Sequence, residues 1–239
     1  MPQPLLKLMP KNDPDGGSWV NTGPDRPLEE EALSALAFGV ENHMAHLDYV
    51  MAGIVGSLTV GKAKPVIDYY LELRNDSSKS AMIHAMARSH LEPDRLKAFN
   101  SIWKLYEIVR KQRNPIAHWI WGTCEKLPKA LVCIDPRAIM KIEGKRDVMN
   151  ALARKAKKEN NAFEAMAFEE ASWVIRSEAN KEFQVYRESD FREIMRDMKV
   201  ALTLVAAFSV VVRDDRIDPE VGQQKFRQLI QMPEFQSLA

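Results

Sequence analysis

An apolar stripe that ends in two arginines is the feature of this sequence that most constrains its fold. In the stretch before Arg113, apolar residues recur at steps of three and four, which places them on one face of an α-helix. They are Leu96, Phe99, Ile102, Trp103, Tyr106 and Val109. The next positions on that face hold Arg110 and Arg113. Because a buried guanidinium needs a partner for its charge and its donors, this helix end is either a structural ion pair or an anion-binding site.

The residues after Arg113 predict a helix break. Asn114 precedes Pro115, and the residue before a proline is disfavoured in the α region. Asparagine is a good N-cap and proline is favoured at the first helical position, so we expect a new short helix to begin at Pro115. His118 would lie in its first turn, where backbone N–H groups attract anions. Arg113 and His118 would then face one small volume from either side of the break.

The segment R-N-P-I-A-H over residues 113–118, followed by an aromatic residue and then by W-G, resembles the Arg-x4-His signature of the HEPN domain (higher eukaryotes and prokaryotes nucleotide-binding). Its setting over about residues 28–122 is similar too: a long first helix, a second helical region, then a helix ending in the motif. The resemblance implies a helical bundle, usually dimeric, which in many members is a metal-independent ribonuclease. Ile120 replaces a tyrosine that some toxin members carry for nucleotidylation, so that regulation is not implied here.

The resemblance implies that Arg113 and His118 are catalytic, and we expect Asn114, Arg110 and Glu41 to support them. The chemistry suits these residue types, because RNA can be cut by its own 2′-hydroxyl if a group near neutrality moves the proton. A planar guanidinium can stabilise the negative charge that collects on the phosphorane. The competing interpretation is a non-catalytic HEPN-like dimer that binds a nucleotide, an RNA or a protein partner, such as a cognate antitoxin.

Composition sets limits on these functions. The net charge of +1 gives no global signature of nucleic-acid binding, so any RNA contact must come from local patches. Two cysteines, Cys124 and Cys133, fit a reducing compartment and no zinc ribbon. His43 and His46 lack a third ligand nearby, and we expect no metal and no cofactor. Without a leader or a membrane-spanning run, the sequence predicts a cytoplasmic protein that does not contact a membrane.

The N-terminal part of the chain predicts a tail and then a long helix. Residues 1–27 are rich in proline and lack periodicity, which indicates a flexible tail that is ordered only if it docks. Residues 28–58 carry one apolar stripe, and a second one made by Phe38, Ala45, Tyr49 and Ala52. A helix with two apolar faces is sandwiched inside a bundle or between protomers, so we expect a homodimer. Glu41 and Asp48 on this helix are candidate partners for the two arginines.

The remaining sequence predicts a mainly α fold, a HEPN-like antiparallel helical bundle with a small β ribbon. Helices are expected at 65–73, 79–91, 163–176, 190–213 and 219–232, and the β-like runs at 130–134 and 183–186 are expected to pair. We expect one domain over 28–232, with a basic insertion around 136–180 and a tail at 233–239. Residues 141–158 hold seven basic residues against two acidic ones. This indicates a solvated helix face or an arm that contacts phosphates.

Overall fold

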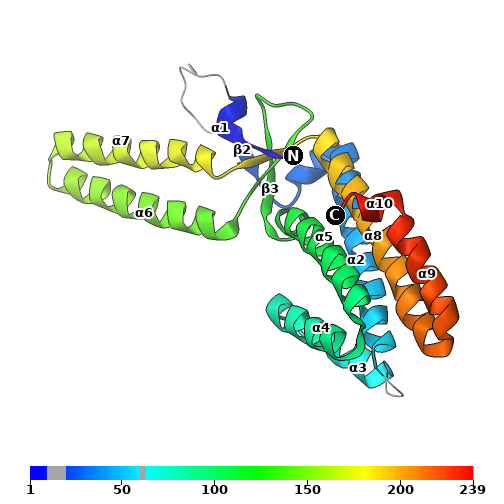
Figure 1. The fold of residues 1–239 in the computed structure, drawn as a ribbon. Helices are drawn as coiled ribbons and strands as arrows, with labels where there is room; N and C mark the ends of the chain where they lie inside the picture. The colour runs from blue at the N-terminus through cyan, green and yellow to red at the C-terminus, as the bar shows by residue number, and fades with distance from the viewer. Residues whose placement is uncertain (10–19, 60–62, 239) are drawn as a thin grey trace. The chain divides into compact units, whose positions relative to one another are not determined.

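The computed structural model describes residues 1–9, 20–59 and 63–238, and it is mainly helical with one small antiparallel sheet. The chain divides into two compact units (Figure 1). Unit 1 contains Met1–Phe38 and Asn114–Glu193, and unit 2 contains Gly39–Arg113 and Ile194–Ala239. Helices α2 (Glu31–Ser57), α5 (Pro93–His118) and α8 (Glu188–Ile217) each contribute residues to both units. The sequence predicted one domain over 28–232, whereas the structure has two units and includes part of the expected tail in unit 1.

Unit 1 is built on a five-stranded antiparallel sheet with the order β1-β5-β4-β3-β2. The strands are β1 (Gln3–Pro4), β2 (Val20–Thr22), β3 (Ile120–Cys124), β4 (Leu131–Ile134) and β5 (Gln184–Tyr186). The predicted pairing of the 130s with the 180s is confirmed, since Leu131 lies opposite Tyr186. The sequence predicted a ribbon of two strands, whereas the sheet has five. The edge strands β1 and β2 come from the expected tail and are only two and three residues long, too short to show a period.

Gly122 explains how β2 approaches β3. It lies opposite Thr22 in the register of these two strands. A Cβ atom at this position would lie 2.4 Å from the backbone oxygen of Asn21. No residue but glycine therefore allows the two backbones to come this close.

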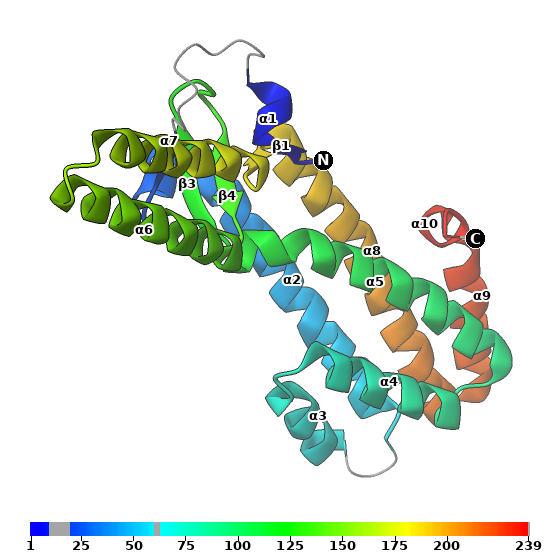
Figure 2. The ribbon, with the colours of Figure 1, turned by 90° about the vertical axis from the view of Figure 1, so that its left-hand side faces the viewer.

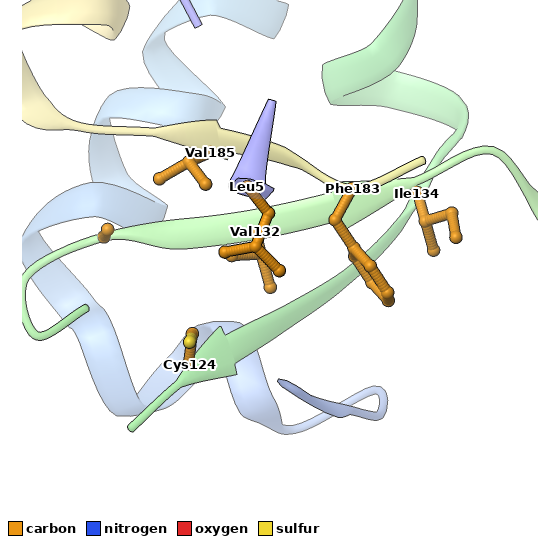
Figure 3. Packing of buried hydrophobic residues seen from close by; sticks show 7 residues of the cluster. Leu5, Cys124, Val132, Ile134, Phe183 and Val185 are labelled. Atoms are coloured by element: carbon orange, nitrogen blue, oxygen red, sulfur yellow. The ribbon is translucent and has the colours of Figure 1, made fainter. Parts of the chain in front are cut away.

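The two faces of the sheet bury different side chains. On one face lies an apolar cluster that includes Leu5, Cys124, Val132, Ile134, Phe183 and Val185 (Figure 3). On the other face, the ring of Trp121 lies 5.4 Å from that of Tyr186 and 6.1 Å from that of Phe191 at the start of α8. Trp121 is half-buried, and its ring packs against this aromatic group of unit 1.

The basic insertion is a helical hairpin. Helix α6 (Pro136–Lys158) and helix α7 (Ala162–Glu178) run side by side in opposite directions (Figures 1 and 2). Asp135 caps α6 by accepting a hydrogen bond from the backbone N–H of Arg137 at 2.8 Å. Ser172 of α7 donates to Asn150 of α6 at 2.9 Å, and Lys157 pairs with Glu169 at 2.5 Å. Unit 1 is completed by α1 (Leu5–Leu8), η1 (Arg26–Glu30) and η2 (Ala179–Lys181).

Unit 2 is a helical assembly in which the predicted stripe of α5 forms the core. Its other helices are α3 (Ala63–Glu72), α4 (Asp76–His90), α9 (Pro219–Gln231) and α10 (Pro233–Gln236). Phe99 of α5 lies 5.9 Å from Phe208 of the apolar α8, and both rings are buried. Within the described residues, no helix is both long enough and apolar enough to cross a membrane. The expected tail at 233–239 begins with the short helix α10.

The second apolar stripe of α2 is not buried as a stripe. Phe38 is 73% exposed and Tyr49 is 76% exposed, whereas Ala52 is buried. Of the two arrangements that the sequence left open, burial inside the bundle is therefore wrong for these two rings. Packing against a second chain stays a prediction.

His84 of α4 is half-buried among aromatic side chains of unit 2. Its ring makes edge contacts with Phe99 at 5.5 Å and with Trp103 at 5.1 Å. Burial lowers the pKa of His84, and the charge of Arg88 lowers it further.

The lowered pKa of His84 predicts a pH-dependent stability. The unfolded chain binds the proton from about pH 6.5 downward, while folded His84 stays neutral to a lower pH. The free energy of unfolding should therefore fall as the pH drops below about 6.5. Urea denaturation at a series of pH values should show this slope in the wild type and less of it in His84→Leu. His90→Leu, at the exposed end of the same helix, is the matched control, and an equal loss of slope in both variants would contradict the assignment.

Candidate functional site

Helix α5 passes through the motif without a break, which corrects the predicted cap at Asn114. The helix extends from Pro93 to His118 with Pro115 inside it. A proline inside a helix removes one hydrogen bond and costs about 3 kcal/mol. Only one turn follows Pro115, and that turn is held by other contacts. Ile116 is buried, the N–H of Trp119 donates to the carbonyl of Pro115 at 3.1 Å, and Trp121 Nε1 donates to the carbonyl of Ile116 at 3.0 Å.

His118 consequently lies at the C-terminal end of a helix, where carbonyl groups rather than N–H groups face outward. The argument for an anion site at a helix N-terminus therefore does not apply to it. Its side chain is exposed, and Asn114 is half-buried. The expectation that both would face one small volume relied on a helix break, and α5 has no break there. Arg113 belongs to unit 2 and His118 to unit 1, so a site shared by the two residues stays a prediction.

Arg113 is held by a carboxylate of helix α2 within unit 2. Its Nη2 lies 2.6 Å from Glu41 Oε2, and its Nε donates to the same oxygen at 3.0 Å. The side chains are 25% and 32% exposed, so the pair is partly shielded from water. Glu41 Oε1 is buried and has no hydrogen-bond partner among the described residues. The ion pair is one of the two interpretations of the stripe, and Glu41 is one of the two carboxylates that the sequence offered as a partner for the arginines.

Arg110 is part of a second cluster in unit 2. Its guanidinium lies 3.3 Å from Asp76 of α4 and above the ring of Tyr106, 5.8 Å from the ring centre. Tyr106 donates to Asp48 of α2 at 2.6 Å, so Asp48 binds a tyrosine rather than either arginine. Burial, reinforced by the charge of Asp48, raises the pKa of Tyr106, so the phenol stays protonated as the donor. The sequence did not predict Asp76 as the partner of Arg110. Its place at the start of α4, directly after the N-cap Asn75, accounts for an acidic residue without such a partner.

The arrangement does not form a metal site. Among the described residues, no group of three or more histidine, cysteine, aspartate or glutamate side chains could hold a metal ion. His43 is engaged locally, because its Nδ1 lies 2.7 Å from the carbonyl oxygen of Gly39 on the same helix. In unit 2, the carboxylates of Asp76 and Glu41 neutralise the partly buried guanidinium groups of Arg110 and Arg113. These two ion pairs connect α5 to α4 and to α2.

Comparisons of this chain with known proteins identified no similar protein. No family model, no curated protein and no solved structure matches this chain.

The Arg113–Glu41 pair should contribute measurably to the stability of unit 2. A charged hydrogen bond that is partly shielded from water contributes more to the free energy of unfolding than an exposed ion pair does. A double-mutant cycle with Arg113→Met and Glu41→Gln should therefore give a coupling free energy of about 1 kcal/mol. Lys64–Asp68 is the matched control, because this pair is also within unit 2 but is 87% and 52% exposed. Its coupling should be about 0.3–0.5 kcal/mol. Urea denaturation measures both cycles, and equal couplings would contradict a structural role for Arg113.

Proposed function

We propose that this chain is a non-catalytic, HEPN-like helical module that binds single-stranded RNA and acts as a homodimer. The observation that carries the non-catalytic assignment is the ion pair of Arg113 with Glu41, within unit 2. His118 lies at the C-terminal end of helix α5, where carbonyl groups face outward and no backbone N–H groups are offered to an anion. Arg113 is moreover engaged by Glu41, which stabilises the folded unit rather than a reacting phosphate.

The basic surplus on helix α6 supports RNA as the ligand. Residues 141–158 hold seven basic and two acidic side chains, in a chain whose net charge is only +1. The basic residues of this stretch are exposed, apart from the half-buried Arg146. Phosphate contacts by exposed lysines and arginines give affinity without base specificity, and they weaken with salt.

A metal-independent ribonuclease is the second candidate, and the R-N-P-I-A-H segment is the observation that favours it. Its reaction would leave a 2′,3′-cyclic phosphate, with a guanidinium stabilising the phosphorane and His118 moving a proton. In this candidate, a two-fold dimer would bring the Arg113 and His118 of both chains to one groove.

Incubation of the purified full-length chain with mixed single-stranded RNA and EDTA tests the two candidates. We expect fluorescence anisotropy to show RNA binding that weakens steeply as salt rises, while gels show intact RNA. Arg113→Ala and His118→Ala should then leave binding unchanged wherever circular dichroism shows a preserved fold. The proposal fails if the wild type cuts RNA in EDTA and both variants lose about 10²-fold or more in rate without rescue by Arg113→Lys.

The homodimer rests on the exposed aromatic rings of helix α2. Phe38 and Tyr49 belong to the second apolar stripe of α2, and both are more than 70% exposed. A helix that is apolar on two sides can place one of them against a second chain. Light scattering at micromolar concentration should give twice the 27.3 kDa mass of one chain. Tyr49→Glu should shift the mass toward the monomer, whereas Tyr69→Glu, also an exposed tyrosine of unit 2 but on α3, should not. A monomeric wild type would refute the dimer.

A further inference from the structure

A basic pocket lies beside the start of helix α6, wholly within unit 1. It has a volume of about 350 Å³, toward the lower end of the range for small-molecule sites. Its charged lining consists of Arg137, Lys141 and Lys145 of α6 and of Lys181 and Glu182 around the end of η2. Among the described residues of the lining, four cationic side chains stand against one carboxylate.

The spacing of the α6 residues explains this concentration of charge. Arg137, Lys141 and Lys145 are four positions apart, and such residues lie above one another on a single helical face. Like charges at this spacing destabilise a helix. A bound anion would relieve this repulsion.

The rest of the lining is apolar. Ala138 and Ile142 of α6 pack against the core of the sheet, which fixes the position of this wall. Ile175 of α7 contributes from the other helix of the hairpin. A pocket with a cationic rim and an apolar wall is suited to a ligand that has both a phosphate and a ring.

We propose that this pocket binds a small organic phosphate, with the phosphate at Arg137, Lys141 and Lys145 and the ring against Ile142. The contacts come from side chains, because the backbone N–H of Arg137 already donates to Asp135. The phosphate belongs either to a free nucleotide or to the 5′ end of an RNA strand. The site is separate from the α5 motif, and it stands whether or not the protein cuts RNA.

Calorimetric titration of the full-length chain with AMP, adenosine and inorganic phosphate tests the pocket. AMP should bind best, because only AMP offers both the phosphate and the ring. Lys141→Glu should weaken AMP binding by about tenfold or more, the loss expected for one charged hydrogen bond. Arg154→Glu is the matched control, since it makes the same charge change at an exposed position of α6 outside the pocket. Lys145→Gln, a milder change, should give a smaller loss in the same direction.

The outcomes separate this proposal from the proposed function. Equal losses of AMP affinity in Lys141→Glu and Arg154→Glu would show that AMP is held by diffuse charge attraction, which would overturn the pocket. Tight binding of adenosine, or no binding of AMP, would also overturn it. Tighter binding of 5′-phosphorylated than of 5′-hydroxyl RNA, lost in Lys141→Glu, would assign the site to strand ends; preference for AMP alone would assign it to free nucleotides. RNA with a 5′-hydroxyl that binds while AMP does not would leave the proposed function standing without the pocket.

Discussion

The passage of helix α5 through Pro115 is the constraint on which the rest of the structure depends. A proline at this place disfavours a helix by about 3 kcal/mol, yet α5 continues for one more turn and leads directly into β3. The indole of Trp121 donates back to Ile116 and its ring packs on Tyr186, so the strand fixes the turn that precedes it. The sheet and the last turn of α5 therefore stabilise one another.

This continuity explains why the motif residues could be recognised in the sequence, whereas the backbone conformation at Pro115 could not be predicted from it. Local rules for Asn114 and Pro115 favour a cap and a new helix, and these rules contain no term for the tertiary contacts of Ile116 and Trp121. The stripe of α5 was predictable because burial of one helical face is a local pattern. The pairing of Leu131 with Tyr186 was also accessible, since both runs are β-like. The edge strands were not, because their two or three residues pair only after a sheet exists.

The same distinction applies to the candidate site. That a carboxylate of α2 would meet an arginine of α5 followed from the stripe, and Glu41 meets Arg113. The assignment of the other partners required the helix packing of unit 2, which places Asp48 at Tyr106 and Asp76 at Arg110. For the basic pocket, the four-residue spacing of Arg137, Lys141 and Lys145 was visible in the sequence. Its meeting with Lys181, more than thirty positions later, depends on the hairpin.

The sheet register has a consequence for the two cysteines. Cys133 lies opposite Trp121 and shares its face of the sheet. Cys124, three positions after Trp121, belongs to the opposite face. A disulfide between them would have to cross the sheet, so the thiols stay separate while the sheet is intact. Burial raises the pKa of both thiols and keeps them from the thiolate form that alkylating reagents attack. The chain therefore contains two natural chemical reporters, one on each face, whose labelling rates measure how often the sheet opens.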